Sequence, residues 1–208
     1  MNLLLKKLYL EGREFVTSEE IKRYCRSLRI DYKRNLRYLL SRNYLVRIFK
    51  GIFYLRSMEE VKIGRVRYDI LELVAKGLGI KGVENWYFGL YTALKLNNMT
   101  HEHFTVDYVI NDAIFRARPM GIAGYKFRFL KLKPSLLKFG IKNNKIRYSD
   151  AEKTILDFIY VWRYRGTPEE RIVMDLSDYT GNLSREKILE YSGHYPKGVG
   201  RIVERVIE

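Results

Sequence analysis

Residues 44–55 have the sequence YLVRIFKGIFYL, in which β-forming side chains stand on both sides of one Lys50-Gly51 step. Branched and aromatic runs that are separated by such a step predict a β-hairpin. Gly51 provides the positive φ that a tight hairpin turn requires, because glycine has no Cβ to clash. We therefore predict two antiparallel strands with a lysine at their tip.

Two helices are predicted directly before this hairpin. Thr17 can cap the first one, because Glu20 stands three residues later and completes a reciprocal capping box. Asp31 can cap the second one, which is predicted over about residues 32–43. The apolar residues of the first helix recur at the spacing of one helix face: Ile21, Tyr24, Cys25 and Leu28. Two helices, a tight turn and a hairpin predict a winged helix-turn-helix domain over residues 1–57.

The second of these helices carries bases on one face and no acid after its cap. A helix that is only solvated usually mixes acids with bases, because opposite charges one turn apart stabilise it. A face of bases alone favours a phosphate-binding surface, with a merely solvated face as the alternative. The residues that we expect to bind DNA are Lys33, Arg34, Arg37, Tyr38, Ser41, Arg42, Arg47 and Lys50.

The expected roles of these residues follow from their positions. The second helix would enter the major groove, where Arg34 and Arg37 are best suited to bidentate contacts with guanine. Tyr38 and Ser41 would make adaptable contacts beside them. Lys50 at the hairpin tip, with Arg47 nearby, would touch phosphate or the minor groove. The same fold used for protein contacts is the alternative.

The composition supports a polyanionic partner. The chain has 208 residues and a net charge of +15, and its first 56 residues carry 14 bases and five acids. A charge excess of this size favours nucleic acid as the partner. Cys25 is the single cysteine, so no intramolecular disulfide can form. No apolar run approaches the ~18 residues of a membrane-spanning helix, and we expect a cytoplasmic protein without membrane contact.

The rest of the chain predicts a second domain of mixed α/β character. Residues 57–64 are polar and lack strong periodicity, which predicts a linker or connecting element, and the second domain is expected over residues 65–208. A buried helix is predicted over residues 85–96 and a strand over residues 104–110. The segment from Thr167 to the end has helical periodicity and forms a helical tail. Together these elements predict an α+β protein.

One further strand is predicted over residues 125–129, where apolar and basic side chains alternate. Its basic face, Lys126 and Arg128, could add phosphate contacts. A solvated sheet face is the alternative.

The stretch Asp150-Ala151-Glu152-Lys153 could support catalysis, because paired carboxylates beside a lysine can hold Mg²⁺. The same residues also fit a helix start, in which Ser149 and Glu152 form a capping box. No third ligand is evident upstream, and His101-Glu102-His103 lacks a partner at ligand spacing. No phosphate loop, dinucleotide fingerprint or catalytic serine elbow occurs. We therefore expect no enzyme, cofactor or metal site.

Three stretches carry a resemblance to a known family. They are the hairpin at 44–55, the predicted helix YFGLYTAL at 87–94 with the Asn-Asn-Met-Thr turn that follows it, and RYSDAEKTILD at 147–157. The third looks like the Ser-x-x-Glu-Lys-Thr-Leu-x-Asp segment of that family. Over about residues 15–160 the chain resembles the AbiEi-type antitoxins of bacterial and archaeal type IV toxin–antitoxin systems. Beyond Trp162 the sequence departs from the pattern.

The resemblance implies a transcriptional autoregulator. It implies binding to the operator of the protein's own promoter through the N-terminal domain. It also implies antagonism of a nucleotidyltransferase-like toxin through the C-terminal domain. The family's C-terminal domain has no catalytic residues to carry over, which agrees with the motif search.

Three hypotheses follow. The first is a sequence-specific autorepressor that binds double-stranded DNA and serves as the antitoxin of such a system. The second is a winged-helix transcriptional regulator whose C-terminal domain senses a ligand or forms a homodimer, with no toxin. The third is a nucleic-acid enzyme that uses the acids around residue 150.

Overall fold

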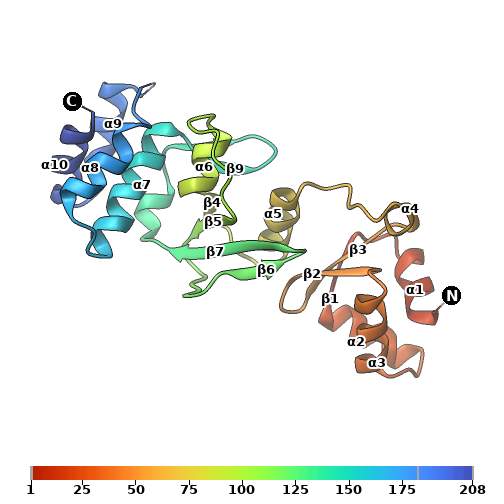
Figure 1. Ribbon diagram of the computed structural model, residues 1–208. Helices are drawn as coiled ribbons and strands as arrows, with labels where there is room; N and C mark the ends of the chain where they lie inside the picture. The colour runs from red at the N-terminus through yellow and green to blue at the C-terminus, as the bar shows by residue number, and fades with distance from the viewer. Residues whose placement is uncertain (1, 182, 208) are drawn as a thin grey trace. The chain divides into compact units, whose positions relative to one another are not determined.

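The computed structural model describes residues 2–181 and 183–207, and within them ten α-helices and two β-sheets form an α+β protein, as predicted (Figure 1). The chain divides into two compact units. The first comprises Met1–Gly82 with Gly121–Gly124, and the second comprises Val83–Met120 with Tyr125–Glu208. The first unit therefore runs past residue 57, where the sequence places its end.

The first unit begins with three helices and three short strands. They are α1 (Leu3–Leu10), β1 (Phe15–Thr17), α2 (Ser18–Ser27), α3 (Tyr32–Ser41), β2 (Leu45–Phe49) and β3 (Ile52–Leu55). The strands form an antiparallel sheet in the order β1-β3-β2. The predicted hairpin is confirmed, and Gly51 in its turn has a φ of 80°. The sequence missed β1, because three residues are too few to show an alternation.

The predicted helix starts are also confirmed. Thr17 and Glu20 form the reciprocal capping box of α2, and the Asp31 carboxylate accepts a hydrogen bond from the backbone N–H of Arg34. On α3 the Leu39 side chain is buried. The helix ends two residues earlier than expected, because Asn43 adopts a left-handed conformation with a φ of 58°.

The segment at residues 57–64, predicted as a linker or connecting element, contains the helix α4 (Met58–Ile63). Ser57 and Glu60 form its capping box, a signal that the sequence contains. The next helix, α5 (Ile70–Ile80), packs against the hairpin through Gly77. A Cβ at that glycine would lie 2.7 Å from Cγ2 of Ile48, so only glycine permits this close approach.

The second sheet has six strands in the order β6-β7-β5-β4-β9-β8. They are β4 (Trp86–Phe88), β5 (Val106–Asn111), β6 (Met120–Ile122), β7 (Tyr125–Lys131), β8 (Ile141–Asn143) and β9 (Arg147–Ser149). The pairs β5–β7 and β4–β9 are parallel, while β4–β5 and β8–β9 are antiparallel. The helix predicted over residues 85–96 is wrong in its first part, because β4 fills it and α6 spans only Leu90–Leu96.

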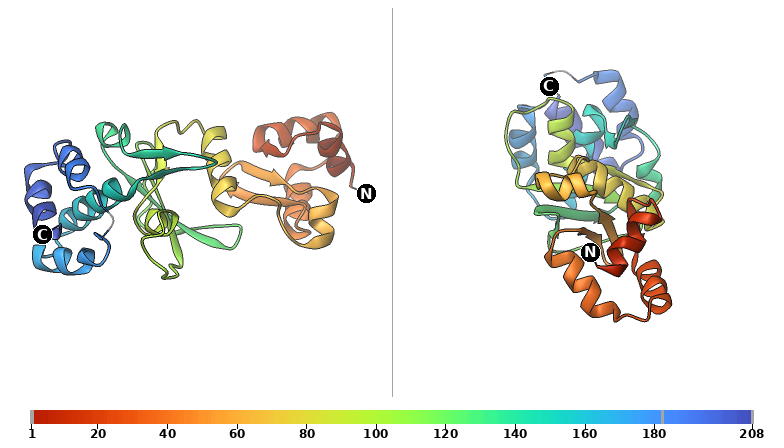
Figure 2. Two further views of the ribbon diagram at one scale, coloured as in Figure 1. Left: turned by 90° about the horizontal axis from the view of Figure 1, so that it is seen from above. Right: turned by 90° about the vertical axis from the view of Figure 1, so that its right-hand side faces the viewer.

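The helix α7 (Ala151–Tyr164) is the centre of the second unit. It contacts α6 and the helices α8 (Glu169–Ser177), α9 (Arg185–Ser192) and α10 (Lys197–Val206), which gather around it in both figures (Figures 1 and 2). These three helices confirm the predicted helical tail. Within the described part of the chain, no helix has both the length and the apolar character needed to cross a membrane.

Candidate nucleic-acid interface

Six of the eight predicted site residues lie on or directly after α3. The bases Lys33, Arg34, Arg37 and Arg42 are exposed, as are Ser41 and Tyr38. The Tyr38 side chain keeps 40% of its surface exposed and stacks on the ring of Tyr44 at 6.5 Å between centroids. The Ser41 hydroxyl donates to the carbonyl oxygen of Tyr38, so its hydrogen is engaged within the helix. This face of α3 therefore presents charge and one aromatic ring to solvent.

The other two predicted residues lie on the β2–β3 hairpin. Lys50 is exposed in the turn, and Arg47 is exposed on β2 with its guanidinium 5.6 Å from the Phe53 ring centre. The turn is fixed to the start of α2, because the backbone N–H of Ser18 donates to the Gly51 carbonyl at 2.8 Å. Among the described residues, no hydrogen bond joins the α3 set to the hairpin set. The two sets are separate parts of one unit.

The bases of this surface have no internal counterions. Across residues 2–181 and 183–207, no ion pair involves the cations of α3 or of the hairpin. By contrast, Arg13 of the same unit pairs with Glu20, and Lys7 pairs with Glu11 at 2.7 Å. Unpaired exposed cations remain free for an external anion, and a row of them suits a phosphate backbone.

A further exposed base lies beside the predicted set. Lys22 on α2 is exposed, and its ammonium lies 5.6 Å from the ring centre of Tyr32 at the start of α3. Its charge therefore extends the basic face of α3 onto the preceding helix. The sequence hides it because Glu19 and Glu20 stand beside it along the chain.

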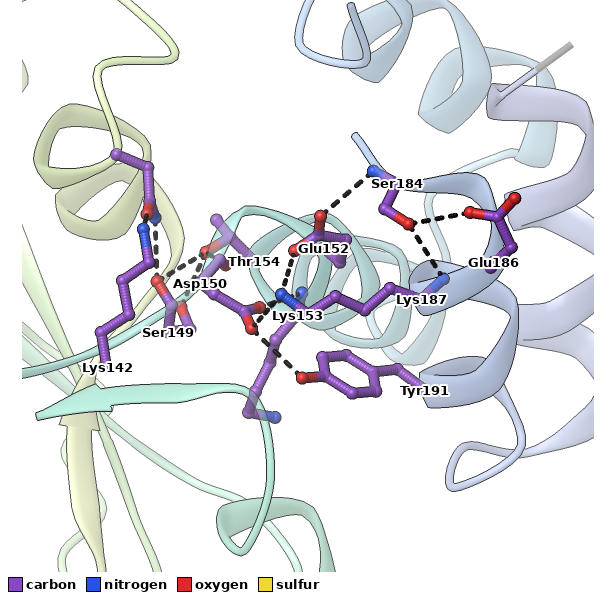
Figure 3. Close-up of polar contacts among 11 residues, drawn as sticks. Lys142, Ser149, Asp150, Glu152, Lys153, Thr154, Ser184, Glu186, Lys187 and Tyr191 are labelled. Carbon is purple, nitrogen blue, oxygen red and sulfur yellow. Dashed lines mark hydrogen bonds and ion pairs between the residues drawn. The ribbon is translucent and has the colours of Figure 1, made fainter. Parts of the chain in front are cut away.

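The acids around residue 150 have structural partners. Asp150 is the N-cap of α7 and accepts from the backbone N–H of Lys153 at 2.9 Å, so the predicted Ser149–Glu152 capping box is wrong. Ser149 ends β9, and its hydroxyl is 2.7 Å from that of Thr154. Glu152 accepts instead from the backbone N–H of Ser184 at 3.1 Å (Figure 3). The sequence could not show this, because Ser184 is distant along the chain.

Lys187 of α9 binds both carboxylates. Its ammonium lies 3.0 Å from Oδ2 of Asp150 and 2.9 Å from Oε2 of Glu152 (Figure 3). Desolvation acts to lower the pKa of Lys187, but the hydrogen bonds and charges of the two acids outweigh it and raise that pKa. Burial acts to raise the pKa of Glu152, but the bonds from Lys187 and from backbone N–H groups outweigh it and lower that pKa. The three side chains form one ion-pair network.

Lys153 is fully buried in a second network beside this one. Its ammonium lies 3.0 Å from the Tyr195 hydroxyl and 3.3 Å from Oδ1 of Asp157. The hydroxyls of Tyr87 and Tyr195 each donate to Asp157 at 2.7 Å. Burial lowers the pKa of Lys153, while the Asp157 charge opposes that shift. Burial, aided by the same carboxylate, raises the pKa of both tyrosines.

No group of three or more potential metal ligands gathers among the residues that the structure describes. The sequence His101-Glu102-His103 lies in the loop between α6 and β5. Cys25 is a free cysteine, buried on the apolar face of α2.

The comparisons with known proteins give a likeness of fold. No family model matches the sequence, and no curated protein matches it. A similar solved structure is that of the RV2827C protein from Mycobacterium tuberculosis, with 13% sequence identity and a TM-score of 0.61. The match covers 98% of this chain and 74% of the mycobacterial one. At this identity the likeness establishes a shared architecture for nearly the whole chain.

Proposed function

We propose that the first unit is a winged helix-turn-helix that binds double-stranded DNA, and that the protein is a transcriptional autorepressor. The observation that carries the proposal is the exposed face of α3, which bears only basic charge and has no internal counterions. Such a face is stable on its own only because it is solvated, and a polyanion is the natural ligand for it.

The order of elements supports the domain assignment. The order α1-β1-α2-α3-β2-β3, with a sheet ordered β1-β3-β2, supports a winged-helix assignment. In such domains the second helix of the helix-turn-helix enters the major groove, and here that helix is α3. The hairpin then forms the wing, with Lys50 at its tip.

Within this interface the residues divide into two roles. Arg34 and Arg37 are proposed to read guanine through bidentate hydrogen bonds, while Tyr38 and Ser41 make adaptable contacts. The remaining bases are proposed to bind phosphate and to set the register on the duplex. They are Lys22, Lys33, Arg42, Arg47 and Lys50.

For the second unit we propose a partner-binding role without catalysis. The acids that could have held a metal are instead engaged, Asp150 as a helix cap and Glu152 in an ion pair with Lys187. The resemblance to AbiEi-type antitoxins suggests a nucleotidyltransferase-like toxin as that partner. A gene for such a protein beside this one favours the antitoxin, and its absence favours a regulator that senses a ligand or dimerises.

The test is binding of the full chain to a duplex from its own promoter, measured by fluorescence anisotropy across a salt series. Phosphate contacts predict a log–log slope of about −0.9 for each phosphate neutralised. Arg34→Ala and Arg37→Ala are each expected to weaken promoter binding by about 1–3 kcal/mol and to relax the preference for the promoter sequence. Lys50→Ala is expected to weaken binding to all duplexes about equally and to reduce the magnitude of the log–log salt slope by about one.

Arg65→Ala is the matched control, because Arg65 is an exposed arginine of the first unit that lies outside α3 and the hairpin. It should leave the affinity and the slope nearly unchanged. The assignment of α3 as the reading helix fails if Arg34→Ala and Arg37→Ala bind the promoter as tightly as Arg65→Ala does.

A further inference from the structure

The second unit contains a groove of about 920 Å³ that is distant in sequence from the proposed DNA interface. Three segments line it: the loop after β5 at residues 115–117, the end of β7 with the turn that follows it, and the C-terminal end of α7. The groove is therefore built within one unit from elements of a single folded core.

The floor and the walls of the groove are apolar and aromatic. Leu130, Leu132 and Val161 form a buried apolar floor. Two rings stand exposed beside it, Phe115 with 57% and Tyr164 with 85% of its surface open to solvent. A third ring, that of Tyr160, lies one turn before Tyr164 on α7 and is held by edge-on packing against Tyr195 at 5.8 Å. Exposed apolar and aromatic patches of this kind mark ligand-binding grooves.

All charge around the groove is positive. The lining contains no acidic side chain, and its cations are Arg116, Arg128, Lys131, Lys133 and Arg165. No ion pair engages any of them within residues 2–181 and 183–207. The Arg128 guanidinium donates to the carbonyl oxygen of Ala117 at 3.1 Å, which holds it at the wall. The groove thus combines an apolar floor with free cations at its rim.

We propose that this groove binds a single strand of nucleic acid. Its cations would follow the phosphate backbone, and the rings of Tyr164 and Phe115 would stack on unpaired bases, which is how single-strand sites in general work. A duplex keeps its bases inside the stack and cannot offer them to these rings. The proposal stands on the second unit alone and does not require the DNA interface of the first.

The lining also predicts low selectivity within single strands. It contains no serine, threonine, asparagine, aspartate or glutamate, so its only charged or amide-like base-reading groups are its arginines and lysines, which we expect to bind phosphate. Stacking on aromatic rings tolerates any base. We therefore expect RNA and DNA strands to bind about equally and with little sequence preference.

An acidic protein segment is the competing occupant, and the groove suits it less well. Protein interfaces bury a core that is depleted of charged side chains. Here five cations surround a short apolar floor, and the most exposed ring, Tyr164, offers a flat face rather than a pocket for a side chain. A chain of phosphates with flat bases matches both features.

The test uses the full-length protein and labelled ten-nucleotide strands of deoxythymidine and uridine, with affinity measured by anisotropy. Tyr164→Ala is expected to weaken the affinity for both strands by roughly 5-fold to 100-fold, which is the effect of one lost base stack. Tyr125→Ala is the matched control, because Tyr125 is 55% exposed and lies outside the groove. An abasic strand of equal length should bind weakly and should not distinguish Tyr164→Ala from the unmodified protein.

The charge is tested in the same way. Lys131→Gln with Lys133→Gln should weaken binding of both strands. The number of phosphate contacts calculated from the salt dependence should fall by about two. Lys138→Gln with Lys145→Gln, which removes two exposed lysines outside the groove, should not. Each measurement is repeated in protein carrying Arg34→Ala and Arg37→Ala, where single-strand binding should persist. This repeat separates the groove from the proposed duplex interface.

Two results would overturn the proposal. One is equal strand affinity for Tyr164→Ala and Tyr125→Ala, with thermal unfolding confirming that both fold. The other is competition by a ten-residue polyglutamate as strong as that by deoxythymidine, which would assign the groove to acidic protein segments instead.

Discussion

The cations of the two units lie in opposite environments. On α3 of the first unit, Lys33, Arg34 and Arg37 are exposed and form no ion pair within the described residues. In the second unit, Lys153 is fully buried and its ammonium is surrounded by Asp157, the Tyr195 hydroxyl and three aromatic rings. Water solvates the first group, whereas only the protein solvates the second.

This difference indicates what each region is for. A buried charge without partners costs several kcal/mol, so Lys153 persists only within a network that satisfies it. An exposed charge costs little folding free energy and can be stabilised by an external anion that binds to it. The partners of Lys153 are therefore inside the chain, and we expect the partners of the α3 bases to be outside it.

The largest effect is expected for Lys153→Ala. The change leaves Asp157 buried with only hydrogen bonds from Tyr87 and Tyr195, and removing one member of a buried ion pair costs about 3–5 kcal/mol. Urea unfolding at pH 7 measures this loss. Lys138→Ala, at an exposed position, is the control and should cost under about 0.5 kcal/mol. Similar small losses in both variants would show that the Lys153 network does not hold the second unit together.

The next effect concerns Glu60, a buried acid of the first unit that is 7% exposed. It accepts hydrogen bonds from the Tyr54 hydroxyl and from the backbone N–H groups of Ser57 and Arg67. Burial acts to raise the pKa of Glu60, but these donors outweigh it and lower that pKa. Glu60→Gln is expected to reduce the free energy of unfolding at pH 7 by about 1–3 kcal/mol.

The pH dependence of this variant follows from the same shift. Because the pKa of Glu60 is lower in the folded state, the unfolded chain binds the proton more readily, and stability rises with pH. The contribution of Glu60 is complete above the unfolded pKa of 4.5 and is lost as the pH falls through the folded one. Between about pH 5 and pH 3, the free energy of unfolding measured by urea titration should therefore fall less for Glu60→Gln than for the unmodified protein. Glu59→Gln on the exposed side of α4 should keep the original profile.

A smaller effect is expected for Thr17→Ala at the start of α2. The Thr17 hydroxyl accepts from the backbone N–H of Glu20, and losing such a cap costs about 1 kcal/mol. Thr17→Ser keeps the oxygen and should restore most of the loss in thermal unfolding. A deficit that serine does not restore would assign the effect to the threonine methyl group instead of the cap.

The sequence predicted the first unit well because its signals are local. The Thr17 box, the Asp31 cap and the Gly51 turn each depend on residues within a few positions of one another. All three lie where the sequence places them. The Ser57–Glu60 box was equally local, and α4 was missed because its polar surface was interpreted as a linker.

The second unit was harder to predict because its decisive contacts join distant positions. Glu152 accepts a hydrogen bond from Lys187, which lies 35 positions away in the sequence, and Asp157 accepts one from Tyr87, which lies 70 positions away. No periodicity along the chain reports such pairs. The aromatic run before Gly89 suits a strand and a helix equally, and only pairing of β4 with β5 and β9 decides between them. The sequence indicated one cation of the groove, Arg128, but not the groove itself, because its cations come from three separate segments.

The smallest effect on folding is expected for a triple variant of α3, Lys33→Gln with Arg34→Gln and Arg37→Gln. These side chains form no ion pairs in the described residues, so the free energy of unfolding should change by under about 0.5 kcal/mol. Lys33 and Arg37 stand one turn apart and repel each other, so any change at low salt should be a gain that disappears at high salt. Promoter binding by the same variant should fall sharply. Urea unfolding at two salt concentrations measures the first result, and a loss above about 1 kcal/mol would mean that these bases serve the fold and not an external anion.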